Sequence, residues 1–376
     1  MRRIASQVRD RLLPVAAWTR RRRWNASDDT ILIVQPDHLG DILLSQPAVR
    51  HLREIHPDSR LIAVVGPWSR EIATIAWPVD AVVTVAFPGF TRAPAASPIA
   101  PYRQLKREAR RIRALRAKSA YILRPDAWWA AWLASMSVPD VVCSDEPRTR
   151  RFATRVVTVP DHEHAALRAL RIAAGAGGQD ITAASSRRLC LPESADAARE
   201  ANRLRNERGV AGRYLVIHPG SGTFVKEWPA ARWKAVADAF AREDLRVILT
   251  GSPAEAEMCH DIASANPNCQ SLAGQTSIPV LIELMRGAAA ALGPDSGPLH
   301  LAVAAGTPTV HVFGPSGPRR YGPWGDPARH RVVSAGWSCP RCGDLSAARG
   351  PACGCMLAIQ PAEVIDAARS VLADNA

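Results

Sequence analysis

Residues 292–315, LGPDSGPLHLAVAAGTPTVHVFGP, combine small and polar residues in an order suited to binding an anion. An apolar run ends at Gly293 as a buried strand would, and Ser296 follows as a candidate N-cap of a short helix. Gly306 ends that helix before a second apolar run begins. Backbone N–H groups at the start of a helix are free to bind phosphate. The stretch therefore predicts a strand, a turn, a helix and a strand around a phosphate site.

Three more residues of this stretch have candidate roles. Asp295 can accept hydrogen bonds from the hydroxyl groups of a sugar or ribose, and Gly297, like Ser296, directs a backbone N–H at a phosphate. His300 lies inside the expected helix, where it is either a contact of a diphosphate or a packing residue with satisfied hydrogen bonds. The residue types leave both explanations of His300 open.

A second phosphate-binding candidate follows the apolar run 214–218. The small residues Ser221 and Gly222 let backbone N–H groups approach a diphosphate, and Lys226 supplies a positive charge for the leaving group. The spacing is not that of a Walker P-loop. Considered as a single residue, a lysine such as Lys226 is most often a solvated surface residue.

An acidic residue follows the next apolar run, at 246–250. Glu255 ends the turn GSPAE and is the first candidate for a nucleotide ribose contact, with Glu257 as the alternative. Capping of the following helix is the competing explanation.

In the first half of the chain, Asp41 follows Gly40 where the apolar run 31–34 gives way to a helical pattern. Open α/β sheets bind their ligands at such strand-to-helix turns. A carboxylate there can take the proton of a sugar hydroxyl as that hydroxyl attacks an anomeric carbon. The alternative is an acidic residue that only favours the helix N-terminus, which is worth about 0.3–1 kcal/mol.

These motifs together resemble glycosyltransferase family 9, the heptosyltransferases. The stretch 292–315 resembles the donor-binding signature of that family, and the matching residues are Asp295, Ser296, Gly297, Pro298, His300, Leu301, Ala302, Gly306, Phe313, Gly314 and Pro315. Two further blocks, residues 31–52 and 216–233, are also similar to the family. The resemblance extends from about residue 30 to the C-terminus.

The resemblance implies an activity and roles for particular residues. It implies transfer of heptose from ADP-heptose to a lipopolysaccharide core or related glycan. Asp41 falls on the catalytic base of the family, Lys226 on a lysine that contacts the donor phosphate, and Glu255 on the acidic residue that meets the ribose. Gln35 stands where the family usually has a basic residue, six positions before the base.

The chain contains no Asp-x-Asp, the pair by which many sugar transferases hold a divalent ion on the donor. Protein cations and helix dipoles must then balance the charge of the leaving group, so we expect no cofactor to be required for catalysis. The resemblance implies inverting transfer. Three alternatives remain open: a different nucleotide sugar, a protein acceptor, and a non-enzymatic protein that binds nucleotides or nucleic acid.

Alternating apolar and helical patterns predict an α/β fold with parallel sheets. The expected strands are near 31–34, 61–65, 81–85, 120–123, 214–218, 246–250, 288–292 and 309–313. The resemblance implies the GT-B architecture, two Rossmann-like doubly wound parallel-sheet domains that face a central cleft. The boundaries we expect are a basic leader over 1–27, an acceptor domain over 28–187, a donor domain over 188–360 and a C-terminal helix over 361–376.

The positive charge of the chain is concentrated in two segments. Residues 1–24 carry eight Arg and one Asp, and residues 103–118 carry eight Lys or Arg against Glu108 alone, whereas the whole chain has a net charge of +13. No nucleic-acid-binding motif accompanies them, so no nucleic acid partner is expected. Solvated helix faces and contact with an anionic membrane surface both explain such segments. With no secretory signal or membrane span in the sequence, we expect a cytoplasmic protein, peripheral on the inner membrane in the second case.

Four of the eight cysteines, Cys339, Cys342, Cys353 and Cys355, lie within 17 residues. A cytosolic protein seldom uses such a cluster for disulfides, which leaves a structural Zn or Fe site or reduced, metal-free thiols. The other four cysteines are isolated and are expected to be small buried residues.

Overall fold

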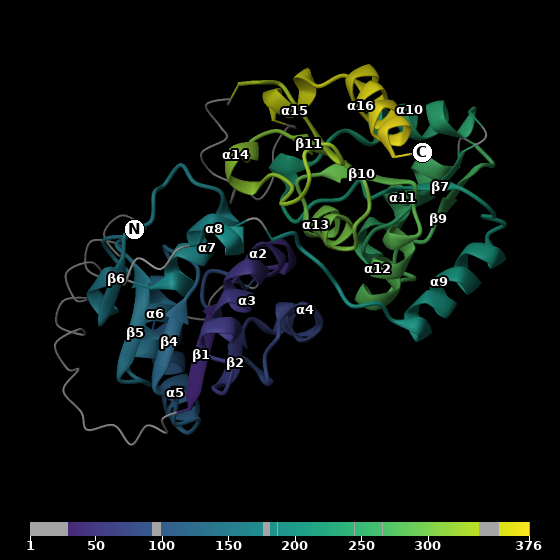
Figure 1. Ribbon diagram of the computed structural model, residues 1–376. Helices are drawn as coiled ribbons and strands as arrows, with labels where there is room; N and C mark the ends of the chain where they lie inside the picture. Colours follow the sequence, from purple (N-terminus) through teal and green to yellow (C-terminus); the bar gives the residue numbers. More distant parts are fainter. Residues whose placement is uncertain are drawn as a thin grey trace. The chain divides into compact units, whose positions relative to one another are not determined.

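Two parallel sheets of six strands each form the framework of the chain, one in each half (Figure 1). The computed structural model describes residues 29–91, 99–175, 181–185, 187–243, 245–264, 266–337 and 353–375. The chain divides into two units, Met1–Arg187 and Arg188–Ala376. The fold is α/β, with the two Rossmann-like sheets of the GT-B architecture.

The sheet of the first unit has the strand order β3-β2-β1-β4-β5-β6, and all its pairs are parallel. Its strands are β1 (Thr30–Gln35), β2 (Arg60–Val65), β3 (Ala81–Thr84), β4 (Ser119–Ile122), β5 (Asp140–Ser144) and β6 (Arg155–Val157). The chain moves outward from β1 to β3 and then returns to the other side of β1. The order therefore reverses between β1 and β4, the position at which open α/β sheets bind ligands.

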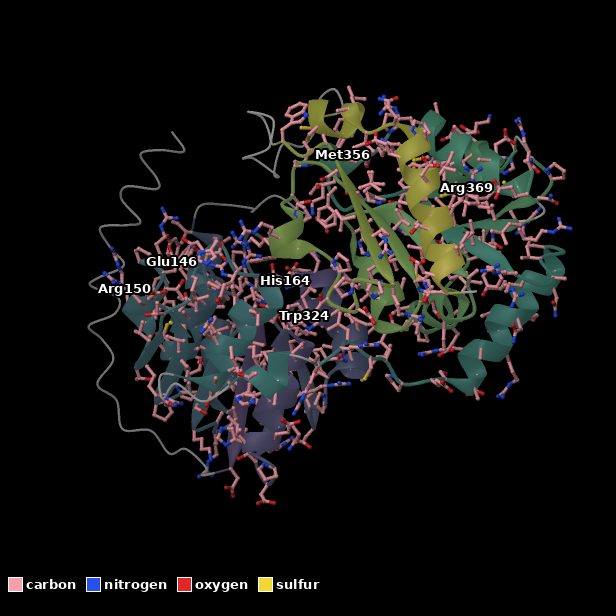
Figure 2. All side chains as sticks on the ribbon, turned by 45° about the horizontal axis from the view of Figure 1, so that its top comes forward. Glu146, Arg150, His164, Trp324, Met356 and Arg369 are labelled. Atoms are coloured by element: carbon pink, nitrogen blue, oxygen red, sulfur yellow. The ribbon has the colours of Figure 1, made fainter. Side chains whose placement is uncertain are left out.

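Helices connect these strands. They are α2 (Leu39–Leu44), α3 (Gln46–Ile55), α4 (Arg70–Ala76), α5 (Ala100–Arg113), α6 (Trp128–Ser135), α7 (Ala165–Ala174) and α8 (Thr182–Ser185), with short 3-10 turns at Pro67–Ser69 and Arg150–Phe152. At the start of α7, Nδ1 of His164 accepts a hydrogen bond from the backbone N–H of Ala166 at 3.1 Å (Figure 2).

The helical spacing of apolar residues over 42–55 predicts one continuous helix, but this prediction was wrong, because α2 ends at Leu44 and α3 begins at Gln46. Pro47 at the start of α3 has no N–H, so the hydrogen-bond ladder cannot continue through it. Ser45 closes α2 instead, since its backbone N–H and its hydroxyl both donate to the carbonyl oxygen of Asp41.

The tryptophans of the WWAAW segment, residues 128–132, pack in the core of the first unit. Trp129 is buried and meets Phe87 edge to face, with ring centroids 5.9 Å apart. Trp132 stacks on Phe152 at 5.7 Å. Aromatic pairs of this kind each contribute about 0.5–1.5 kcal/mol beyond their area burial. This packing holds α6 against the sheet just after β4.

The second unit repeats the topology with the order β12-β11-β10-β7-β8-β9, again parallel throughout. Its strands are β7 (Tyr214–Ile217), β8 (Arg246–Leu249), β9 (Cys269–Ser271), β10 (Ala290–Pro294), β11 (Thr309–Phe313) and β12 (His330–Ser334). The order reverses between β7 and β10. The carboxyl ends of these two strands therefore form the second expected ligand position.

The helices of the second unit are α9 (Ala195–Glu207), α10 (Ala230–Ala241), α11 (Ala256–Ala263), α12 (Ile278–Arg286), α13 (Gly297–Ala304), α14 (Pro318–Tyr321), α15 (Gly354–Ala358) and α16 (Pro361–Asp374), with 3-10 turns at Phe224–Lys226 and Pro253–Glu255. None of the helices in the described part of the chain is long and apolar enough to span a bilayer.

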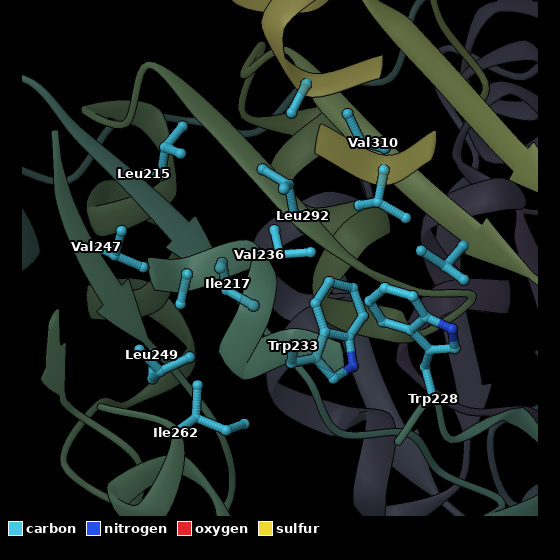
Figure 3. Close-up of a cluster of buried hydrophobic side chains, with 14 of the residues drawn as sticks. Leu215, Ile217, Trp228, Trp233, Val236, Val247, Leu249, Ile262, Leu292 and Val310 are labelled. Atoms are coloured by element: carbon cyan, nitrogen blue, oxygen red, sulfur yellow. The ribbon is translucent and has the colours of Figure 1, made fainter. Parts of the chain in front are cut away.

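A buried apolar cluster fills the space between the second sheet and its helices (Figure 3). Trp228 and Trp233 meet edge to face in this cluster, with ring centroids 4.7 Å apart, and both are almost fully buried. Nε1 of Trp228 donates a hydrogen bond to the carbonyl oxygen of Ile359 at 3.3 Å. The cluster therefore fixes the segment that follows Lys226 onto the C-terminal part of the chain.

Candidate active site

The two predicted phosphate-binding segments meet at the switch point of the second unit. The residues of 218–223 follow β7, and those of 295–297 follow β10. Nζ of Lys226 lies 2.7 Å from Oδ2 of Asp295, although the two residues are 69 positions apart in sequence. The structure thus joins Lys226, Asp295 and the start of α13 in one polar cluster.

Asp295 lies at the centre of this cluster. It is buried, and its Oδ1 lies 3.7 Å from Nε2 of His300, which is buried as well. Burial disfavours the charge of Asp295, but the adjacent His300 ring and the Lys226 ammonium outweigh it, so the pKa of Asp295 is below its usual value. Asp295 is therefore an ionised acceptor at neutral pH.

Ser296 is the N-cap residue of α13, as predicted, but its hydroxyl does not cap the helix. A cap oxygen normally accepts from the second or third helical N–H, and the second position is Pro298, which has none. The Ser296 Oγ is buried and has no hydrogen-bond partner among the described residues. An unused hydroxyl beside Asp295 is suited to hydrogen bonding a ligand.

Glycines bring the backbones of this site close together. A Cβ on Gly293 would lie 2.6 Å from the carbonyl oxygen of His218 and would also collide with Leu299. A Cβ on Gly220 would overlap the carboxylate of Glu255. The approach of β7 and β10 therefore requires glycine at position 293, whereas glycine at position 220 leaves room for the Glu255 carboxylate.

Glu255 has the helix-capping contacts that the sequence offered as its alternative role. Its Oε2 accepts hydrogen bonds from the backbone N–H of Ser252 at 2.6 Å and from the Ser252 hydroxyl at 2.8 Å. The same carboxylate lies against Gly220 in the turn after β7. Capping and a position beside the phosphate-binding turn are therefore both observed.

The turn after β7 is held by its own side chains. Oγ of Ser221 donates to the carbonyl oxygen of Thr223 at 2.9 Å and accepts from the Thr223 backbone N–H at 3.2 Å, with Gly222 between them. His218 is buried with its Nδ1 3.1 Å from the Thr250 hydroxyl, and burial lowers its pKa to about 4. His218 is consequently neutral at physiological pH.

Two further buried histidines extend this polar cluster into the sheet, and sequence analysis missed them. Nε2 of His311 lies 2.9 Å from the hydroxyl of Thr309, which lies 2.8 Å from Nδ1 of His330. The rings of His311 and His300 are 5.9 Å apart. Burial lowers the pKa of His311, so it stays neutral beside His300. The sequence signal that could have identified His311 is its position as a polar residue inside the apolar run TVHVF.

In the first unit, the carboxyl ends of β1 and β4 carry a second group of ionisable residues. Asp41 is in the first turn of α2 and half-buried. Asp37 is buried, and its Oδ1 accepts a hydrogen bond from Nη1 of Arg124, which follows β4. Burial and the charge of Asp41 raise the pKa of Asp37, although Arg124 opposes this.

Asp37 and Arg124 were not among the sequence candidates. Each follows a strand by two residues, and β1 and β4 are adjacent in the sheet. Their place after strand ends was therefore the signal that could have identified them. Gln35, by contrast, is buried, and its amide donates to Oγ of Ser45 at 2.9 Å.

Half of the predicted metal cluster lies outside the described residues. Cys339 and Cys342 are not described, and Cys353 and Cys355 are buried near α15. Met356 of α15 lies close to Gly314. Among the residues that are described, no group of three or more His, Cys, Asp or Glu is placed to hold a metal. The metal site stays a prediction.

Of the four isolated cysteines, Cys143, Cys259 and Cys269 are buried as expected. Cys190 is exposed, because it lies in the irregular segment that leads to α9. The basic leader, residues 1–27, lies outside the described part of the chain.

A family model, glycosyltransferase family 9 (heptosyltransferase), matches residues 109–345, which is more than half of the chain. The chain belongs to glycosyltransferase family 9. It is therefore a glycosyltransferase, and its sheets are those expected from the family resemblance.

Curated relatives are similar over different lengths. Lipopolysaccharide heptosyltransferase 3 of Escherichia coli is 33% identical over 129 residues, which cover 32% of this chain and 38% of that protein. Lipopolysaccharide heptosyltransferase 1 of Pseudomonas aeruginosa is 26% identical over 317 residues, which cover 83% of this chain and 85% of the relative.

Solved structures share the fold. The family 9 glycosyl transferase of Veillonella parvula has a TM-score of 0.74 at 22% identity, covering 93% of this chain and 99% of that one. The E. coli heptosyltransferase WaaC, solved with ADP-2-deoxy-2-fluoro heptose, has a TM-score of 0.65 at 20% identity. The match covers 92% of this chain and 100% of that one.

Proposed function

We propose that this glycosyltransferase moves a heptose from ADP-heptose to a lipopolysaccharide core or related glycan, with inversion and without a catalytic metal. The names of the curated relatives support the heptosyl and lipopolysaccharide assignments. The observation that carries the proposal is the cluster of Lys226, Asp295 and Ser296 at the switch point of the second unit. A nucleotide sugar solved in a protein of the same fold supports an ADP-linked donor.

In this mechanism the donor diphosphate takes the place of Asp295 on Lys226. The lysine and the N–H groups of Ser296 and Gly297 then stabilise the departing nucleoside diphosphate, with Ser221 and Gly222 beside it. Asp295, released from the ion pair, accepts a hydrogen bond from a hydroxyl group of the donor, and His300 orients the Asp295 carboxylate. Glu255 contacts the ribose from the turn before α11. Protein cations and backbone dipoles balance the negative charge of the leaving diphosphate, as a divalent ion does in many other sugar transferases.

Asp41 acts as the general base. Its carboxylate takes the proton of the acceptor hydroxyl as the oxygen attacks the anomeric carbon and the bond to the diphosphate breaks. One direct displacement inverts the configuration of that carbon. We accordingly assign residues 28–187 to the acceptor and residues 188–360 with the helix 361–376 to the donor.

The experiment that tests the donor assignment is a turnover assay with a panel of nucleotide sugars. ADP-heptose should be turned over and bound more tightly than UDP- and GDP-sugars, and NMR of the product should show an inverted anomeric centre. Activity in excess EDTA should be unchanged. Preference for a UDP- or GDP-sugar would contradict the donor, and failure to turn over any sugar nucleotide would contradict the transferase mechanism.

Elemental analysis of the same sample tests the four-cysteine cluster. About one zinc or iron per chain, lost when Cys353 and Cys355 are replaced by serine, would support a structural metal. A metal-free protein with full activity would support reduced thiols.

A further inference from the structure

The guanidinium of Arg124 is held between two carboxylates of different character. Its Nη1 donates to the buried Asp37, whereas its Nε and Nη2 donate to the two oxygens of Asp126 at 2.6 and 3.2 Å. The ring of Phe90 covers one face of the guanidinium, with its centroid 5.1 Å from Cζ. Arg124 is therefore fixed on three sides.

The two partners of Arg124 differ in exposure. The Asp37 side chain is 5% exposed, whereas that of Asp126 is 58% exposed. A buried ion pair is costly to break, but an exposed one contributes little and exchanges readily with other anions. Asp37 thus anchors the guanidinium, and Asp126 occupies the edge that faces solvent.

That edge lies in the neighbourhood of the proposed base. Arg124 follows β4 and Asp41 follows β1, and these strands are paired. The carboxylates of Asp37, Asp126 and Asp41 raise the pKa of Arg124 more than burial lowers it. Gln35, at the end of β1, is neutral, and its amide is bonded to Ser45. Arg124 therefore provides a fixed positive charge near Asp41.

We propose that Arg124 binds an oxyanion of the acceptor, a carboxylate or a phosphate, and that Asp126 occupies this position until the acceptor displaces it. A planar guanidinium presents two parallel N–H groups to such anions, as it does here to Asp126. The proposal rests on the acceptor role assigned to the first unit. It makes Arg124 a specificity residue for acidic sugars and Asp126 a competitor of the acceptor.

The test uses one probe in three forms: deacylated core oligosaccharide from cells that lack core heptose, either untreated, with its carboxyl groups reduced to alcohols, or dephosphorylated. With the untreated form, Arg124→Gln should raise the acceptor KM about tenfold or more, because a charged bidentate pair is lost, while kcat changes little. Asp126→Asn should lower the KM a few-fold. The chemical treatment that raises the wild-type KM identifies the anion.

The chain offers a matched control on the opposite edge of the same sheet. Arg155 forms a similar pair with Asp140, with Nε and Nη2 at 3.1 and 2.6 Å from Oδ2, at the amino ends of β5 and β6. Arg155→Gln and Asp140→Asn should leave the acceptor KM unchanged. Arg124→Lys, which keeps the charge without the bidentate geometry, should give an intermediate KM and serves if Arg124→Gln does not fold.

The outcomes separate the two proposals. If the wild type transfers no heptose to any form of the probe, the proposed function fails and this inference fails with it. If the wild type transfers heptose but Arg124→Gln and Arg124→Lys keep the wild-type KM, only the inference is overturned. A raised KM in Asp126→Asn would overturn it as well, since Asp126 would then assist binding.

Discussion

Lys226 is paired with Asp295, and under the proposed mechanism the donor competes with this carboxylate for the lysine. A diphosphate carries more charge than one carboxylate, so the exchange favours the donor. Lys226→Ala should raise the Kd of ADP about 10- to 100-fold, the effect of losing a charged hydrogen bond. Isothermal titration calorimetry measures the Kd of ADP, and Lys234→Ala, on the exposed face of α10, is the control. Equal affinities of the two variants would contradict the role of Lys226.

His218 makes the stability of the second unit depend on pH. Its pKa is lowered to about 4 by burial, whereas the unfolded chain binds the proton near the ordinary value of 6.5. Between these values the unfolded chain binds more protons, so the free energy of unfolding falls as the pH falls from 6.5 towards 4. At pH 5 this titration makes the free energy of unfolding about 2 kcal/mol lower than at neutral pH.

Urea denaturation at pH 7.5 and pH 5 tests this dependence. His218→Asn keeps an acceptor for the Thr250 hydroxyl but does not titrate, so its stability should fall less between the two pH values than that of the wild type. An identical fall in the two proteins would show that His218 does not contribute.

Residue types alone predicted part of the candidate site. The signals for Lys226, Asp295 and Ser296 were local, because each lies in a short segment that follows an apolar run and contains small residues. The pairing of Lys226 with Asp295 was not predicted, since it joins residues 69 positions apart through the adjacency of β7 and β10. The unused hydroxyl of Ser296 also depends on the backbone geometry around Pro298.

At the scale of elements, Gly293 sets the distance between β10 and the turn after β7. Gly293→Ala would force its Cβ against the His218 carbonyl oxygen, 2.6 Å away, and against Leu299. Because a backbone atom cannot move aside cheaply, the variant should lose about 1–3 kcal/mol of stability. It should also bind ADP more weakly, because the start of α13 shifts.

Thermal unfolding and ADP titration measure both effects. Gly317→Ala is the control, since nothing lies within 4 Å of the Cβ that it would add. If Gly293→Ala behaves like this control, the close approach at the switch point does not limit the site.

Eight of the strands in the described part of the chain were expected from the sequence, whereas β5, β6, β9 and β12 were not. Buried parallel strands are continuous apolar runs, so β1, β2, β7, β8 and β11 were apparent from hydrophobicity alone. Helix boundaries depended on single residues. Pro47 divided one expected helix into α2 and α3, and the ladder hydrogen bonds that decide such a break are not visible in the apolar spacing.

On the surface of the molecule, α5 carries a group of exposed basic residues suited to binding an anionic membrane. Arg103, Lys106, Arg107, Arg110 and Arg111 are exposed on this helix, beside the exposed Tyr102. Each cation near an anionic lipid surface contributes about 1 kcal/mol. We propose that this face meets the inner membrane, where a lipopolysaccharide precursor would lie.

Co-sedimentation with vesicles tests the membrane contact. The protein should bind vesicles that contain phosphatidylglycerol and not neutral phosphatidylcholine vesicles, and the double variant Arg103→Glu/Arg110→Glu should weaken binding. The control is Arg199→Glu/Arg203→Glu on α9, where the arginines already pair with acidic neighbours. An equal loss in the two variants would point to net charge instead of a docking face.

The two-unit organisation followed from chain length and from the alternation of strands and helices. The family motifs favour the second unit as the donor unit, because three of them lie after β7, β8 and β10. The acidic and basic residues of the first unit were less apparent. Asp37 and Arg124 come from β1 and β4, and only the strand order makes these strands neighbours.

Turnover by Asp41→Asn is the measurement that tests the mechanism most directly. With ADP-heptose and a core acceptor, kcat should fall about 10²- to 10⁴-fold, the usual contribution of a general base, while the Kd of ADP stays unchanged. Asp58→Asn, at an exposed carboxylate before β2, should keep the wild-type kcat. Wild-type turnover by Asp41→Asn would contradict the assignment of Asp41 as the base.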